Sequence, residues 1–202
     1  MTRASSTQGR GLLYRLYSSR LRREIEAGTV PHHVAMMIDG NRRWARQLGF
    51  TTVSHGHRAG AAKMHEFLRW CDELGIQVVS LYLLSTDNLV KRDSQEMTDL
   101  IEIIADLAET LSHEPGWRVK HVGRAEILPP DLAAGLRTAE ERTRENTGLH
   151  VNLAVGYGGR GEIVDAVRSI IAKHNEKGGS LTELAESLTP EQIGEHLYTG
   201  GQ

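Results

Sequence analysis

The 202 residues carry a formal net charge of −2, and charged residues make up 25% of the chain. This length predicts one globular domain with a sizeable core, and the nearly balanced charge argues against nucleic acid as a partner. Cys71 is the only cysteine, so we expect a packed thiol without a disulfide or metal cluster, in a reducing, cytoplasmic compartment. We expect neither a membrane-spanning helix nor a signal peptide, because no apolar stretch is long enough.

Residues 1–30 interleave arginines with leucines and tyrosines, and we expect them to form an N-terminal extension. The pattern predicts a basic amphipathic helix from about Gly11 to Ala27. Two interpretations of this helix are open. It can lie against a membrane surface, at the inner face of the cell membrane, or it can dock on its own domain with a solvated basic face.

From residue 31 to residue 202, short apolar runs alternate with helical periodicity, which predicts a single α/β domain with a mostly parallel sheet flanked by helices. The expected strands are His33–Ile38, Gln77–Leu84, Arg118–Val122 and His150–Val155. The expected helices are Arg58–Leu74, Ser94–Leu111, Asp131–Asn146, Gly161–Asn175, Ser180–Leu188 and Pro190–Tyr198. The polar stretch after Ser85 is expected to be a loop.

The first strand ends in Asp39-Gly40-Asn41, and basic residues at a helix start follow directly. A carboxylate such as Asp39 can hold Mg²⁺, and Gly40 lets the backbone approach a phosphate closely. The backbone N–H groups at the helix start favour binding of an anion. The guanidinium group of Arg43 can donate two parallel hydrogen bonds to phosphate oxygens. This order predicts phosphate and metal chemistry at one end of the strand, although Asp-Gly-Asn alone would indicate only a turn.

Two further motifs are weaker by themselves. Gly56-His57-Arg58-Ala59-Gly60 is a glycine-flanked helix start, where a capping or surface histidine is the default interpretation. The segment Tyr82–Glu96 takes a buried strand into polar residues at its carboxyl end, which is where ligands bind in open α/β sheets. In a purely local interpretation, Asp87 and Asn88 cap a turn and Glu96 belongs to a capping box.

Taken in order, these motifs and Asn152–Ile163 resemble the conserved blocks of the cis-prenyltransferases, the undecaprenyl diphosphate synthase-like family. The segment His33–Arg46, HVAMMIDGNRRWAR, carries most of the resemblance. The most similar subgroup is the actinobacterial short-chain (2Z,6E)-farnesyl diphosphate synthases, which share a Leu-Tyr-Arg-Leu-Tyr helix like Leu13–Tyr17. The resemblance implies Asp39 as catalytic acid and metal ligand, Asn41 as a catalytic helper and Leu83 as a determinant of chain length. It implies substrate-binding roles for Gly40, Arg42, Arg43, Trp44, His57, Ser85, Asp87, Asn88 and Arg92.

The resemblance also implies an activity. A Mg²⁺-dependent transferase of isoprenoid biosynthesis would condense isopentenyl diphosphate with an allylic diphosphate, here geranyl diphosphate, to a short Z-prenyl diphosphate such as Z,E-farnesyl diphosphate. This would serve as a precursor of a cell-wall lipid carrier, and the enzyme would be a homodimer with peripheral membrane contact. Three alternatives stay open: a longer-chain polyprenyl diphosphate synthase, a non-catalytic subunit of the same fold, and a metal-dependent phosphohydrolase using Asp39 and Asp87.

The chain departs from the family pattern at several positions. Leu84 and Leu89 replace the usual aromatic residues, and Asp87 replaces a glutamate. No arginine lies just upstream of His57, so Arg46 or Arg58 would have to compensate. The family's next block would begin after Gln202, so we expect a truncated chain with little or no activity by itself.

Overall fold

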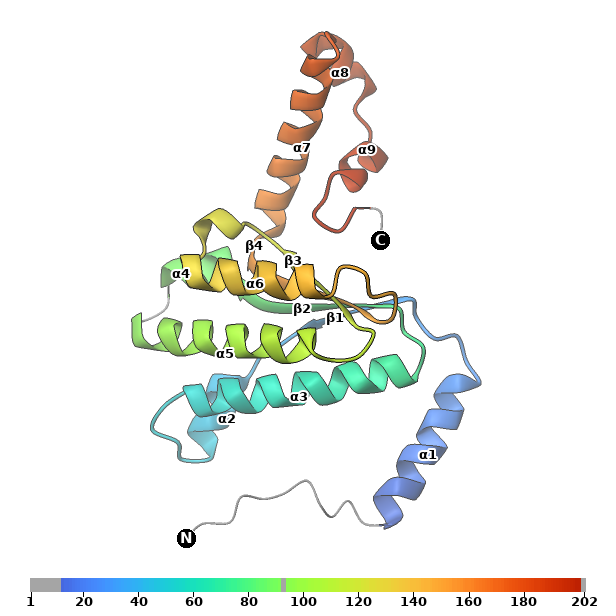
Figure 1. The fold of residues 1–202 in the computed structure, drawn as a ribbon, viewed down its shortest axis with the longest axis vertical. Coiled ribbons are helices and arrows are strands. Elements are labelled where there is room, and N and C mark those ends of the chain that lie inside the picture. Colours follow the sequence, from blue (N-terminus) through green and yellow to red (C-terminus); the bar gives the residue numbers. More distant parts are fainter. Residues whose placement is uncertain (1–11, 92–93, 201–202) are drawn as a thin grey trace.

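A computed structural model describes residues 12–91 and 94–200, and its centre is a parallel β-sheet (Figure 1). The strands are β1 (His33–Met37), β2 (Val78–Ser85), β3 (Arg118–Val122) and β4 (His150–Tyr157), in the spatial order β1-β2-β4-β3. All neighbouring pairs run parallel. The predicted α/β fold is confirmed, and each strand lies within two residues of its expected bounds.

One face of the sheet is covered by a layer of helices (Figure 1). This layer consists of α3 (Ser54–Glu73), α5 (Ser94–Ser112) and α6 (Pro130–Arg142). The remaining elements before β4 are α1 (Leu12–Glu26), α2 (Asn41–Gln47), α4 (Thr86–Lys91) and the short 3-10 helix η1 (Ala125–Ile127). Within the described ranges, no helix is both long and apolar enough to cross a membrane.

The expected loop after β2 is instead the helix α4. Its first residues, Thr86, Asp87 and Asn88, are polar, which in sequence suggests a turn, but the side chain of Ser85 supports the first helical turn. The Ser85 hydroxyl oxygen accepts a hydrogen bond from the backbone N–H of Asn88 at 3.2 Å. A serine that satisfies a free N–H group at a helix start stabilises the helix, so polarity here marks the beginning of a helix rather than a loop.

The core lies between the sheet and the helical layer. Val79, Leu81, Val151 and Leu153 on the two central strands are fully buried, as expected for parallel strands covered by helices. Cys71 on α3 joins this cluster and is 2% exposed. Burial raises the pKa of its thiol to about 11, which keeps it protonated and confirms the predicted packing role.

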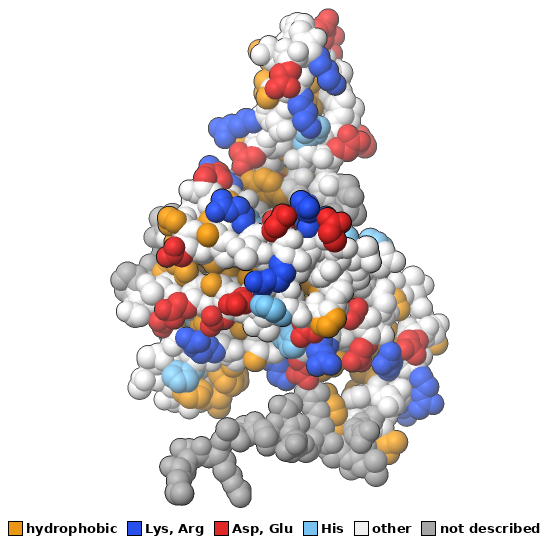
Figure 2. All heavy atoms as spheres, viewed as in Figure 1, with side chains coloured by type: hydrophobic (Ala, Val, Ile, Leu, Met, Phe, Trp, Pro, Cys, Tyr) orange, Lys and Arg blue, Asp and Glu red, His pale blue; other side chains and the backbone are white. Residues whose placement is uncertain are grey.

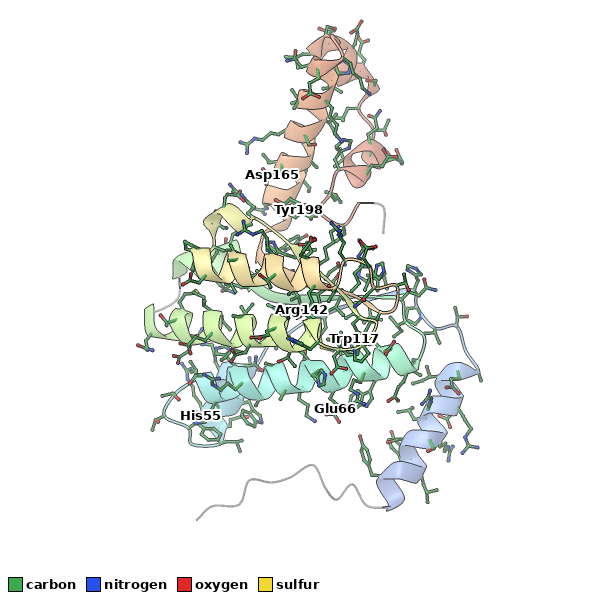
Figure 3. The ribbon with its side chains drawn as sticks, in the orientation of Figure 1. His55, Glu66, Trp117, Arg142, Asp165 and Tyr198 are labelled. Carbon is green, nitrogen blue, oxygen red and sulfur yellow. The ribbon has the colours of Figure 1, made fainter. Side chains whose placement is uncertain are left out.

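The C-terminal helices form an arm. The helix α7 (Gly159–Glu176) starts directly after β4 and projects away from the sheet, and α8 (Leu181–Ser187) and α9 (Pro190–Glu195) fold back along it (Figure 1). The hydroxyl of Tyr198 donates to Asp165 at 2.6 Å at the base of α7 (Figure 3). The Tyr198 N–H donates to Glu162 at 2.9 Å, and Lys120 donates to the Tyr198 carbonyl at 3.1 Å. These bonds tie the returning segment to α7 and β3.

We predict that Leu153→Ala lowers the free energy of unfolding by about 2–5 kcal/mol, because it opens a cavity between the sheet and the helices. Urea denaturation measures the change. The matched control is Leu181→Ala on α8, where the side chain is 68% exposed, and it should change stability by less than about 0.5 kcal/mol. Equal effects of the two substitutions would contradict this placement of the core.

Candidate active site

The site begins at the turn between β1 and α2. Gly40 has φ +90°, a left-handed conformation that residues with a side chain rarely adopt. The Asp39 carboxylate accepts a hydrogen bond from the Gly40 N–H at 2.6 Å. The chain can therefore pass from strand to helix within this turn, and Asn41 already opens α2. The carboxylate of Asp39 is held at the carboxyl end of the strand.

The first turns of α3 pack tightly against Asn41. A Cβ atom on Gly56 would lie 2.2 Å from the carbonyl oxygen of Asn41, and one on Gly60 would lie 2.8 Å from its side-chain amide. Residues four apart lie on one face of a helix, so both glycines face α2. The Gly-His-x-x-Gly spacing is thus explained by packing, because both glycines leave room for Asn41. It lets α3 approach Asn41 and brings His57 beside the Asp39 turn.

A cavity of about 470 Å³ opens at this junction. The predicted site residues that line it are Asp39, Gly40, Asn41, Arg42, Arg43 and His57, together with Ile38, Arg46 and Gln47. The lining thus carries several guanidinium groups beside one carboxylate. Guanidinium groups present planar donors that match phosphate oxygens, so the cavity is suited to an anion of diphosphate type.

His57 is linked to α5 through Glu96, whose role local sequence reasoning missed. The His57 side chain is 6% exposed and that of Glu96 is 10% exposed. Their closest atoms, Nε2 and Oε1, are 3.3 Å apart, and Arg42 Nη2 lies 3.5 Å from Glu96 Oε2. Glu96 therefore positions both a histidine and an arginine of the cavity wall.

A smaller cavity of about 50 Å³, whose lining residues are mostly apolar, shares three residues with the charged one. The shared residues are Ile38, Asn41 and His57, and the other lining residues are Ala61, Leu83, Leu100, Ile103, Ile104 and Leu107. Leu83, predicted to influence chain length, thus lies in the wall of an apolar space that begins next to the charged cavity.

Other predicted site residues lie elsewhere. Ser85, Asp87 and Asn88 are at the end of β2 and on α4, and none of them lines either cavity. Trp44 is 43% exposed and stacks on Phe50 with ring centres 5.9 Å apart. Arg92 lies outside the described residues.

The two arginines considered as replacements for the missing upstream arginine differ in position. Arg46 lines the charged cavity. Arg58 instead forms ion pairs with Glu102 at 3.8 Å and Asp106 at 3.9 Å on α5. The structure therefore favours Arg46 as the additional cation of the site.

The donor set fits Mg²⁺ bound together with its substrate. Among the described residues, no group of three histidine, cysteine, aspartate or glutamate side chains could hold a metal ion. Mg²⁺ in phosphate-binding enzymes commonly takes one or two carboxylates and completes its shell with phosphate oxygens and water. Asp39, exposed beside a cavity suited to diphosphate, matches this type of site and does not match a preformed metal cage.

Comparison with known proteins agrees with the site geometry. A family model described as "Putative undecaprenyl diphosphate synthase" matches residues 37–202, which include every residue of both cavities. The chain belongs to the cis-prenyltransferases. Relatives in this family include isoprenyl transferase 1 of Corynebacterium diphtheriae, which is 49% identical over 190 residues, or 94% of this chain and 71% of that protein. The (2Z,6E)-farnesyl diphosphate synthase of Mycobacterium tuberculosis is 49% identical over 193 residues, or 94% of this chain and 73% of that protein.

Solved cis-prenyltransferase structures share the fold. Lavandulyl diphosphate synthase from Lavandula x intermedia, solved with dimethylallyl diphosphate, superposes with a TM-score of 0.76 at 31% identity and covers 87% of this chain and 72% of its own. A probable undecaprenyl diphosphate synthase from Campylobacter jejuni gives a TM-score of 0.65 at 25% identity, with 85% and 71% covered. The expected family and fold are thereby confirmed.

We predict that Gly56→Ala destabilises the protein, because the added Cβ meets backbone at Asn41 and the α2–α3 junction must open. The cost should exceed about 1 kcal/mol in urea denaturation. The matched control is Gly135→Ala in α6, where no atom lies within 4 Å of an added Cβ; it should stabilise the helix by up to about 1 kcal/mol. A Gly56→Ala protein as stable as this control would disprove the tight junction.

Proposed function

We propose that this cis-prenyltransferase condenses isopentenyl diphosphate with geranyl diphosphate, with Mg²⁺, to give Z,E-farnesyl diphosphate. The observation that supports this most is the joining of two unlike cavities. A space lined by arginines and Asp39 adjoins an apolar space at Ile38, Asn41 and His57. A prenyl diphosphate has the same division into a charged head and an apolar chain. The short product is supported by the name of the 49% identical mycobacterial relative.

The head-group residues have separable roles in this proposal. Arg42, Arg43 and Arg46 donate hydrogen bonds to the diphosphate oxygens and offset their charge. His57 is held by Glu96 at the boundary between the cavities, where it orients the diphosphate end of the allylic substrate. Asn41 is held in place by Gly56 and Gly60 of α3. It lies between the cavity for the diphosphate head and the cavity for the prenyl chain.

The reaction requires stabilisation of a leaving group. The bond between C1 of the allylic chain and the diphosphate oxygen breaks, and the electron pair leaves with the diphosphate. The arginines around Asp39 bind this departing negative charge more strongly than that of the intact ester, which is the main catalytic effect. Mg²⁺ held by Asp39 and the diphosphate would add Lewis-acid stabilisation of the same charge. The isopentenyl double bond attacks C1, and loss of a proton gives the Z double bond.

We also assign substrate-binding roles to Ser85, Asp87, Asn88 and Arg92. Asp39 follows the end of β1, and Ser85 ends the adjacent parallel strand β2, so Ser85, Asp87 and Asn88 share the carboxyl edge of the sheet with the cavity. Ligands of open parallel sheets bind along this edge. The role of Arg92 is proposed from the family resemblance alone.

We predict that Asp39→Ala lowers kcat by roughly a hundredfold or more, because the metal loses its carboxylate ligand. The assay follows incorporation of labelled isopentenyl diphosphate into geranyl diphosphate by the protein. Titration calorimetry on the 202-residue chain should show in parallel that Mg²⁺ no longer strengthens binding of geranyl diphosphate. Asp99→Ala, an exposed aspartate on α5, is the matched control and should retain activity. Near-normal turnover by Asp39→Ala would refute the assignment.

We predict that Leu83→Ala shifts the products of the enzyme toward longer chains. The substitution enlarges the apolar cavity that Leu83 lines, at a stability cost of up to about 2–5 kcal/mol. Leu84→Ala is the matched control, because Leu84 is 1% exposed but lines neither cavity. It should cost similar stability without changing product length. Chromatography of the dephosphorylated products distinguishes the two variants. Unchanged products from Leu83→Ala would show that Leu83 does not limit the length of the product.

A further inference from the structure

The turn between β4 and α7 lies against the start of α4. Ser85 and Tyr157 are register partners in the last pair of the β2–β4 ladder. Thr86, the first residue of α4, therefore comes beside Gly158, which directly precedes α7. A Cβ atom on Gly158 would lie 2.8 Å from Oγ1 and 3.5 Å from Cγ2 of Thr86. The shorter distance is below what real Cβ contacts show, so only glycine lets the two segments approach this closely.

Space, and not backbone conformation, is the reason for glycine at residue 158. Gly158 has φ −156° and ψ 113°, an extended conformation that residues with a side chain also adopt. Gly161, on the first turn of the same helix, differs because no described atom lies within 4 Å of a Cβ added to it. The crowding is thus specific to Gly158, and the absence of a side chain there serves the contact with α4.

Glu162 holds this turn in place from the side of the arm. It is 7% exposed, and its carboxylate accepts hydrogen bonds from the Tyr157 hydroxyl at 2.7 Å and from the Tyr198 N–H at 2.9 Å. Burial and the bond to Glu162 raise the pKa of the Tyr157 hydroxyl, which therefore stays a donor at neutral pH. The Tyr157 ring meets Tyr82 of β2 edge-on, with ring centres 5.2 Å apart. Apolar and charged side chains fill the foot of the arm (Figure 2), so the turn is a firm support.

The helix α4 needs such a support because it is short. It has six residues, and a helix of this length is not stable by its own hydrogen bonds in water. The bond from the Asn88 N–H to the Ser85 hydroxyl fixes its first turn to the end of β2. It does not fix the direction in which the helix leaves the strand. The contact between Thr86 and Gly158 limits that direction from the neighbouring strand.

We propose that Gly158 is a positioning residue for the allylic substrate. Its contact with Thr86 sets the direction of α4 and thereby places the substrate-binding groups at the carboxyl edge of the sheet. This inference rests on the roles proposed above for Ser85, Asp87 and Asn88. Gly158 itself lines neither cavity, so it acts through the helix. Placement matters in enzymes because a displacement of about 1 Å can cost roughly a hundredfold in rate.

The test combines Gly158→Ala with a compensating change, in two measurements on the 202-residue protein that require no turnover. Gly158→Ala should weaken binding of geranyl diphosphate with Mg²⁺ by roughly tenfold in titration calorimetry, because the added Cβ displaces α4. It should also speed amide hydrogen exchange over Thr86–Lys91 in the absence of ligand. Thr86→Ala/Gly158→Ala should restore both, since the remaining Cβ of residue 86 lies at an ordinary contact distance of 3.7 Å. Gly161→Ala is the matched control and should change neither.

The outcomes separate this inference from the proposed function. Failure of the unmodified protein to bind geranyl diphosphate would overturn the proposed function and this inference with it. Binding that Gly158→Ala leaves unchanged would overturn this inference alone, whether or not exchange over α4 becomes faster. A loss of affinity with unchanged exchange over α4 would also overturn it, because the helix would not have moved. So would a loss that Thr86→Ala/Gly158→Ala does not restore, since the effect would then be a general disturbance of the turn.

Discussion

The site depends on the close contact between Asn41 and the glycines of α3. Gly56 leaves space for the Asn41 carbonyl, and Gly60 leaves space for its side chain. Any larger residue would separate α2 from α3 and carry His57 away from the turn that holds Asp39. One contact therefore sets the distance between the charged groups. Since glycine gives up side-chain packing and favours the unfolded chain, its use twice at this junction is a stability cost connected with the site.

The packing at this junction also divides polar from apolar space. Asn41 and His57 border both cavities, and their polar atoms lie between the arginines on one side and Leu83, Leu100 and neighbouring leucines and isoleucines on the other. His57 is nearly buried and needs a partner, which Glu96 provides from α5. The helical layer thus stabilises the site in two ways. It supplies the apolar walls, and it supplies the carboxylate that fixes the histidine at their edge.

Sequence reasoning recovered the strands because buried parallel strands are short, apolar and bounded by polar turns, and it placed Asp39, Asn41 and Arg43 at the end of the first one. It missed α4, because the same residue types that indicate turns also begin helices; Ser85 shows this through its bond to Asn88. It also left the partnership of Glu96 unseen. Glu96 and His57 are 39 residues apart in sequence, and no local spacing predicts a contact between separate helices.

The arrangement along β2 connects the head-group chemistry with the length of the chain that the enzyme accommodates. Leu83 faces the apolar cavity, while Ser85, two residues further along the same strand, starts α4 at the carboxyl edge. A strand alternates its side chains between two faces, but the register between β2 and β4 shifts between Tyr82 and Ser85. Such an irregularity re-aims side chains locally. The irregularity allows one short segment to form part of the wall of the apolar cavity and also to begin a helix at the ligand-binding edge. A change in the side-chain size at Leu83 need not displace the charged groups around Asp39.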